Sequence, residues 1–181
     1  MSITSFVTRL FAHDIRGTKP RIVDLPEPML IVGLSMETSV SQVRRDVPAL
    51  ADQYRHFKLE HGVPNLRQPW AFVAVSRSFD PSTGSFWYMV GDVVTSFDAV
   101  PRELETFEIP AIKYAVFPVR PRNRFGWPVA IAGAKRYAFT EWLPDSGYEP
   151  AGVIDDFEYH DERSTRKRNA QIDLYVAIKA R

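Results

Sequence analysis

The order of secondary-structure patterns repeats once along this chain of 181 residues. Each copy has an extended apolar segment rich in β-branched residues, then apolar residues spaced by three and four, then two more extended segments. These patterns cover residues 21–39, 40–61, 70–76 and 86–94 in the first copy, and residues 107–119, 129–143, 153–160 and 170–179 in the second. Gly62 and Gly147 follow the two helical patterns, 85 positions apart, which indicates an internal duplication.

A duplicated β-α-β-β unit restricts the fold, because one copy alone would expose a sheet edge and half of its core. We therefore predict an α+β fold in which a tandem β-α-β-β repeat forms one mainly antiparallel sheet, with two long helices on one face and a central cleft. The pseudo-repeats cover residues 20–98 and 103–181, divided by the proline-containing join at residues 98–102. Residues 1–19 are predicted to form an N-terminal amphipathic helix or extension.

Composition and charge exclude several classes of protein. Hydrophobic residues make up 45% of the chain, as in a folded globular domain, and no apolar run reaches the ~20 residues that cross a bilayer. The formal net charge is +1, so the chain has no global field that would attract nucleic acid or an anionic membrane. The absence of cysteine excludes disulfides and thiolate metal sites, and it fits a cytoplasmic protein.

The sequence also lacks the common motifs of metal, nucleotide and serine chemistry. Its four histidines have no zinc-site spacing, no glycine-rich phosphate loop follows a predicted strand, and no G-x-S-x-G motif is present. We expect no metal and no cofactor. The one dense basic turn has no interleaved aromatic residues, so we expect no direct nucleic-acid binding. That turn contains Arg163, Arg166, Lys167 and Arg168.

The residues best suited to bind a ligand are acids that share a face with other functional side chains. Glu141 lies on the predicted second helix, one turn after a tyrosine. On the last two predicted strands Glu158 alternates with His160, and Asp173 alternates with Tyr175. The candidate ligand-binding residues are Trp70, Phe72, Trp87, Tyr88, Tyr137, Glu141, Glu158, Asp173 and Tyr175.

Such acids and rings together favour a lipophilic cation as ligand. An acid buried among rings without a partner has its pKa raised by desolvation, and an incoming organic cation restores its charged form. Each ring adds a cation–π attraction of ~0.5–2 kcal/mol. Acids that alternate along a strand often face solvent, however, and aromatic residues often fill a core. Spacing alone therefore does not decide whether these residues form a pocket.

The second copy contains the ordered segments FEIPAIKYAVFPV, EWLPDSGYEP, DFEYHDER and IDLYVAIK, and the first copy opens with PRIVDLPEPMLIVGLSMETS. Together these segments resemble the GyrI-like small-molecule-binding domain, also known as the AraC-type effector-binding domain, over residues 20–180. The resemblance implies a central cleft that binds hydrophobic or cationic compounds. It implies ligand-binding roles for Glu141, Glu158, Asp173, Tyr175, Trp87 and Tyr88. Many members of the family have glutamate where this chain has Asp173.

Three functions are consistent with this resemblance. The first is a stand-alone cytoplasmic protein that binds or sequesters a lipophilic, cationic small molecule, as drug-responsive transcription regulators of the family do. The second is a hydrolase in which a cleft carboxylate acts as general base against reactive electrophilic genotoxins. The third is an interaction protein, such as a gyrase inhibitor, whose partner is a topoisomerase or a regulator.

Overall fold

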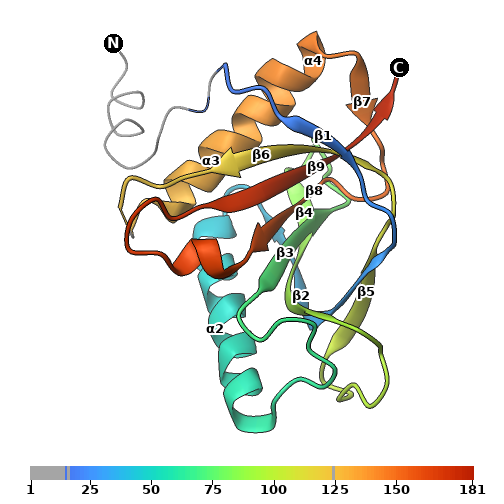
Figure 1. The fold of residues 1–181 in the computed structure, drawn as a ribbon, viewed down its shortest axis with the longest axis vertical. Coiled ribbons are helices and arrows are strands. Elements are labelled where there is room, and N and C mark those ends of the chain that lie inside the picture. Colours follow the sequence, from blue (N-terminus) through green and yellow to red (C-terminus); the bar gives the residue numbers. More distant parts are fainter. Residues whose placement is uncertain (1–14, 16, 124) are drawn as a thin grey trace.

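The computed structural model describes residue 15, residues 17–123 and residues 125–181 (Figure 1). The predicted helix at residues 1–19 therefore lies mostly outside the described residues. In chain order the elements are β1 (Arg21–Asp24), β2 (Met29–Ser39), α2 (Val43–His61), β3 (Phe72–Arg77), β4 (Ser85–Val94), β5 (Glu105–Ile109), β6 (Lys113–Val119), α3 (Trp127–Tyr137), the π-helical turn η1 (Ala138–Trp142), α4 (Leu143–Asp145), β7 (Tyr148–Pro150), β8 (Asp156–His160), the 3-10 turn η2 (Glu162–Thr165) and β9 (Ile172–Ala180).

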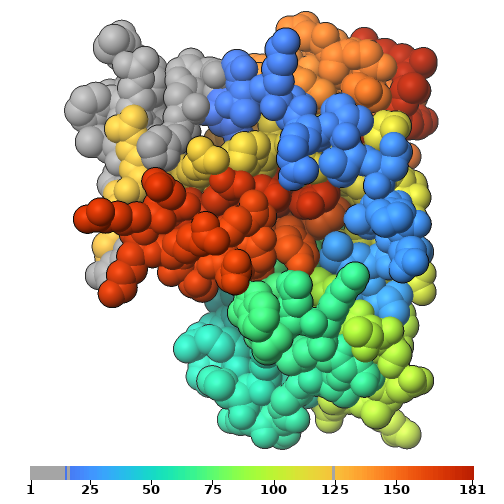
Figure 2. Space-filling model, viewed as in Figure 1, coloured from blue at the N-terminus to red at the C-terminus, as the bar shows by residue number. Residues whose placement is uncertain are grey.

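The nine described strands form one antiparallel sheet in the order β1-β6-β9-β8-β3-β4-β2-β5, with β7 paired to β9. On one side of the sheet lie β1, β6, β9 and β8, and they correspond in this order to β5, β2, β4 and β3 on the other side. The centre of the sheet therefore lies between β8 and β3. The orange-red C-terminal residues accordingly cross the middle of the molecule, between the blue residues of β1 and the green residues of the first copy (Figure 2). The predicted α+β fold with a duplicated unit is confirmed.

Both helices cover the same face of the sheet, as predicted. Residues paired across neighbouring strands project to one face, and one such row runs from Leu174 through Glu158 and Ala74 to Val90. Leu174, at one end of the row, belongs to the core beneath α3. Ala74 and Val90, at the other end, belong to the core beneath α2. The two helices therefore share this face, with the central strands between them (Figure 1).

The opposite face carries a core of its own. Val73, Val75 and Phe157 project there from the central strands, and Tyr114 joins them with an edge-to-face contact to Phe157 at 5.3 Å. Both faces of the central strands are thus buried, so burial alone does not distinguish them. The two faces differ in their charged groups, since Asp156 and Glu158 are on the helix side whereas Asp173 is on the opposite side.

Two differences from the prediction lie at the start of the second copy. Residues 107–119, predicted as one strand, are split into β5 and β6, because Pro110 has no N–H to continue the ladder. β5 pairs with β2 whereas β6 pairs with β1 and β9, so the chain crosses the sheet at this break. The second helix begins at Trp127, before the predicted start, since Pro128 is well tolerated in a first helical turn.

No helix among the described residues is both long and apolar enough to span a membrane.

Candidate ligand-binding site

A buried ion cluster lies at the centre of the helix-covered face. The Lys135 Nζ atom is 2.8 Å from Asp156 Oδ1 and 2.9 Å from Glu158 Oε1. It also donates a hydrogen bond of 3.1 Å to Ser76 Oγ. Asp156 and Glu158 are 3% and 4% exposed, so both carboxylates are withdrawn from bulk water. We call Lys135, Asp156 and Glu158 the seam triad.

The strand register places both carboxylates of the triad in the helix layer. Asp156 and Glu158 are two positions apart in β8 and so share a face. Leu174, directly opposite Glu158 on β9, packs beneath α3. Because α2 contacts β2 and β4 while α3 contacts β6 and β9, the central strands β3 and β8 lie in a seam between the two helices.

The sequence of α3 explains how a lysine reaches this seam. The buried side of the helix carries Ala130 and Ala134, and Ala138 continues the row into η1. Small side chains at every fourth position let the helix lie close to the sheet. Lys135 follows Ala134, and its methylene stem spans the remaining gap, which leaves the side chain 23% exposed.

Aromatic rings surround the triad. The ring of Tyr88 is buried, with its centroid 5.8 Å from Lys135 Nζ. Phe72 stacks on His160 at 4.1 Å with an interplanar angle of 18°, and Trp127 lies 6.2 Å from the same imidazole. His160 Nε2 is 3.4 Å from Glu158 Oε2, which ties the rings to the carboxylates. Phe72 is 39% exposed, so this aromatic group extends from the buried triad to the surface.

The two carboxylates titrate differently although they share one ammonium. Burial raises the pKa of Asp156 to about 6, against the opposing attraction of Lys135. Burial also disfavours the charge on Glu158, but Lys135 and the hydrogen bond with His160 outweigh it and lower the pKa of Glu158 to about 2. Burial and the nearby Glu158 charge raise the pKa of the Tyr88 hydroxyl. Glu158 is therefore ionised and Tyr88 neutral near neutral pH.

Three of the predicted site residues meet at this seam, namely Phe72, Tyr88 and Glu158. Trp87 alternates with Tyr88 on β4 and so points to the opposite face, where the Arg77 guanidinium lies 5.3 Å from its ring centroid. Both Trp87 and Tyr88 are predicted to bind the ligand. The structure assigns Tyr88 to the face with the acids.

Asp173 and Tyr175 share a face, as their alternation predicts, but it is the face opposite the helices. Asp173 is buried and accepts hydrogen bonds from Arg163 at 2.9 Å and from Gln171 at 3.0 Å. Arg21 approaches the same carboxylate at 3.5 Å. Tyr175 stacks on Phe157 at 4.4 Å. The Asp173 charge is thus balanced by arginines, one of which belongs to the basic turn.

The remaining predicted residues lie away from the seam. Glu141 is exposed on η1, and Trp70 is 54% exposed just before β3. Tyr137 lies on the outer flank of α3, where its hydroxyl accepts a hydrogen bond from the Gly17 N–H at 3.2 Å. The structure therefore does not bring Glu141 or Tyr137 together with Glu158.

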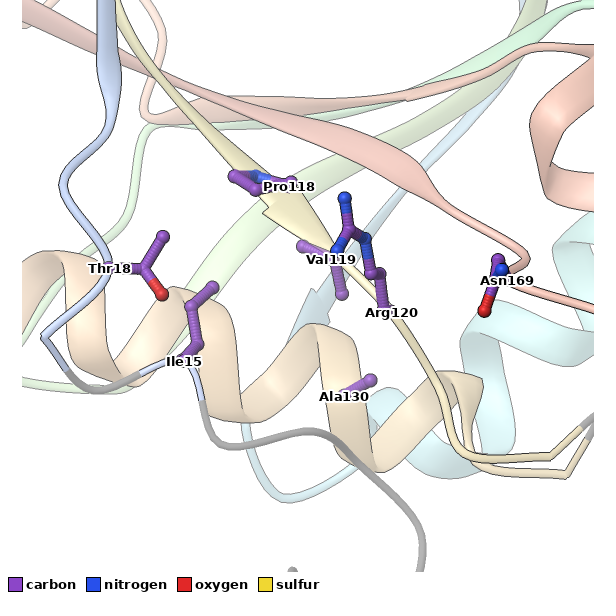
Figure 3. A pocket seen from close by; sticks show the side chains of 7 residues that line it. All are labelled: Ile15, Thr18, Pro118, Val119, Arg120, Ala130 and Asn169. Carbon is purple, nitrogen blue, oxygen red and sulfur yellow. The ribbon is translucent and has the colours of Figure 1, made fainter.

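Two cavities have residues of α3 in their walls. One, of about 350 Å³, is lined by Ile15, Thr18, Pro118, Val119, Arg120, Ala130 and Asn169 (Figure 3). The other, of about 480 Å³, includes Tyr137, Trp142 and Tyr148 in its wall. Neither cavity is lined by a predicted ligand-binding acid.

Sequence reasoning missed Lys135, Asp156 and Trp127. Asp156 had a usable signal, because it continues the alternation of Glu158 and His160 along one strand. Lys135 had none, since a single lysine in an amphipathic helix is typical of a solvent-exposed position.

Comparison with known proteins identifies the family. The family model described as Cass2, integron-associated effector binding protein, matches residues 21–178. This chain therefore belongs to the Cass2 family of effector-binding proteins. The predicted GyrI-like effector-binding domain is confirmed.

A curated relative of this chain is a transcriptional regulator. The transcriptional regulator BrlR of Pseudomonas aeruginosa is 38% identical over 167 residues, which are 91% of this chain and 57% of BrlR. The chain thus spans little more than half of the length of that relative.

Solved structures share the Cass2 fold at low sequence identity. SAV2435 bound to tetraphenylphosphonium has a TM-score of 0.68 at 10% identity, covering 90% of this chain and 94% of that one. The integron cassette protein of Vibrio cholerae has a TM-score of 0.59 at 12% identity, covering 90% and 97%. At these identities the likeness concerns the fold alone.

Proposed function

We propose that this protein binds a lipophilic monocation at the seam between α2 and α3. The observation that carries the proposal is an excess of buried negative charge, because two carboxylates, Asp156 and Glu158, face the single ammonium of Lys135. With both acids ionised the triad has a net charge of minus one. That excess would attract a monocation to a site already withdrawn from water.

The rings beside the triad favour an organic cation over a metal ion. The Tyr88 ring lies beside the Lys135 ammonium, and Phe72 and Trp127 lie beside His160, which contacts Glu158. Each face attracts a desolvated cation by about 0.5–2 kcal/mol, and the apolar surface of the ligand adds hydrophobic burial. Among the described residues, Asp156 Oδ1 accepts no aligned hydrogen bond beyond its ionic contact with Lys135, so it retains acceptor capacity.

Two further observations support a binding protein. SAV2435, which shares this fold, was solved with the lipophilic cation tetraphenylphosphonium. Glu158 has a pKa of about 2, and so weak a base removes a proton from water poorly at neutral pH, which disfavours the hydrolase alternative at this acid. The similarity to the transcriptional regulator BrlR suggests that ligand binding controls a transcription regulator.

The test is isothermal titration with tetraphenylphosphonium at pH 8. We expect the wild type to bind at micromolar concentration and Glu158→Gln to bind at least tenfold more weakly, since the change removes the excess charge. Glu141→Gln is the matched control, because it makes the same change on the exposed η1. Absence of binding by the wild type, or equal affinity of Glu158→Gln and wild type, contradicts the proposal.

A further inference from the structure

We propose that Lys135 is a built-in competitor for this site, so that a ligand cation must displace an ammonium that the protein itself supplies. The inference rests on the proposed function and adds to it a residue that sets affinity and selectivity. Its basis is that Lys135 already makes each contact a ligand cation would seek: two carboxylate oxygens within 3 Å and a tyrosine ring at 5.8 Å.

The surroundings of Lys135 show that its ammonium is held inside the seam. Asp156 and Glu158 approach it from β8, Ser76 from β3 and Tyr88 from β4. Asp155 and His160 complete the titratable groups that act on the two acids. The backbone of Lys135 nevertheless lies on α3, whereas both acids lie on β8. Only the flexible side chain of Lys135 joins its ammonium to the helix.

A flexible stem allows displacement without moving the backbone. Lysine side chains have several rotatable bonds, and this one is 23% exposed, so part of it already meets water. A small cation gains nothing over Lys135, because it offers the same charge without apolar surface. A cation with several rings gains hydrophobic burial in addition, so competition by Lys135 selects for large lipophilic cations.

Removing the ammonium should therefore strengthen ligand binding. We expect Lys135→Met, which keeps the length of the stem, to bind tetraphenylphosphonium at least tenfold more tightly than wild type. The double variant Lys135→Met with Glu158→Gln keeps one carboxylate and no ammonium, which restores the net charge of the wild-type triad. If Lys135 acts by occupying the site, this double variant binds more tightly than wild type; equal affinity would show that only net charge matters and would overturn the inference.

The two proposals fail in different ways. Suppose that the wild type binds tetraphenylphosphonium and Glu158→Gln weakens binding, but Lys135→Met binds no more tightly than wild type. The competitor role of Lys135 is then wrong, whereas the proposed cation site is supported. If Glu158→Gln and the wild type bind equally, or neither binds, the cation site itself is wrong and the competitor role falls with it.

A second measurement needs only the wild-type protein. Acetylation of lysines by acetic anhydride, read by peptide mass spectrometry, reports whether Nζ of Lys135 is accessible. We expect slow labelling without ligand and a severalfold increase when tetraphenylphosphonium saturates the site. Lys179, exposed and ion-paired with Glu149, is the control whose labelling stays constant. Unchanged or reduced labelling of Lys135 at saturation would overturn the displacement.

Discussion

Asp156 and Glu158 are two residues apart on one strand, face the same ammonium, and yet have opposite pKa shifts. The difference arises because His160 adds a second favourable contact for Glu158, at 3.4 Å, whereas burial dominates at Asp156. Asp156 is therefore the member of the pair whose charge changes in mildly acidic solution. It makes the charge of the seam triad dependent on pH.

Cation binding should weaken on acidification. The pKa of Asp156 is raised to about 6, so lowering the pH from 8 to 5 protonates it and removes the net negative charge of the triad. We expect the affinity for tetraphenylphosphonium, which does not titrate, to fall by up to about tenfold in titrations at constant ionic strength. Asp156→Asn should flatten this dependence. Constant or rising affinity at pH 5 would contradict the assignment.

The stacked ring at the surface end of the seam should contribute to affinity. Replacement of Phe72 by alanine removes one π face, worth about 0.5–2 kcal/mol, so we expect binding to weaken by about twofold to thirtyfold. Trp87→Ala is the control, because Trp87 has a similar exposure, 38% against 39%, but lies on the opposite face. A larger loss for Trp87→Ala than for Phe72→Ala would place the ligand on that other face.

The sequence predicted which residues share a face but not which face each pair occupies. Alternation correctly joined Asp173 with Tyr175, yet only the positions of α2 and α3 show that this pair faces away from the helices. Lys135 could not be predicted, because its ion pairs span two elements that are distant in the chain.

At the scale of elements, the backbones of β2 and β4 approach each other closely where the two strands pair. Gly33 and Gly91 are directly opposite each other. A Cβ atom on Gly91 would lie 2.5 Å from the carbonyl oxygen of Val32. This oxygen belongs to the backbone, so it cannot move away by a side-chain rotation. These two glycines therefore permit the approach of the strands that support α2.

Gly91→Ala should lower the free energy of unfolding by about 1–3 kcal/mol, because the added methyl forces the strands apart. Gly133→Ala is the contrasting variant. A Cβ atom there meets nothing within 4 Å and sits inside α3, so we expect stabilisation of up to about 1 kcal/mol. Urea unfolding measures both changes. An unaffected Gly91→Ala variant would show that the sheet tolerates wider spacing here.

Helical periodicity predicted both helices, but the strand pattern of residues 107–119 did not predict that the chain crosses the sheet within this segment. Apolar residues continue through Pro110, so periodicity alone does not separate β5 from β6. The division became visible only from pairing, since β5 joins β2 and β6 joins β1 and β9.

At the scale of the whole molecule, the two copies exchange their first strands. β1 opens the first copy but pairs with β6 of the second, and β5 opens the second copy but pairs with β2 of the first. Each half thus completes the sheet of the other. The sequence predicted the duplication from repeated patterns, whereas this exchange depends on long-range pairing that no local pattern encodes.

Such an exchange should make unfolding a single cooperative transition. Trp70 and Trp87 report on the first copy, and Trp127 and Trp142 on the second. We expect urea curves from tryptophan fluorescence and far-UV circular dichroism to share one midpoint. Two separated midpoints would show that the halves unfold independently.

The location of a bound cation tests the central claim most directly. In a crystal structure with tetraphenylphosphonium, we expect the phosphonium between α2 and α3, about 6 Å or less from the carboxylates of Asp156 and Glu158. Lys135 should then be turned toward solvent. A cation bound beside Asp173 and Tyr175 on the opposite face, or in a cavity on the flank of α3, would contradict the account.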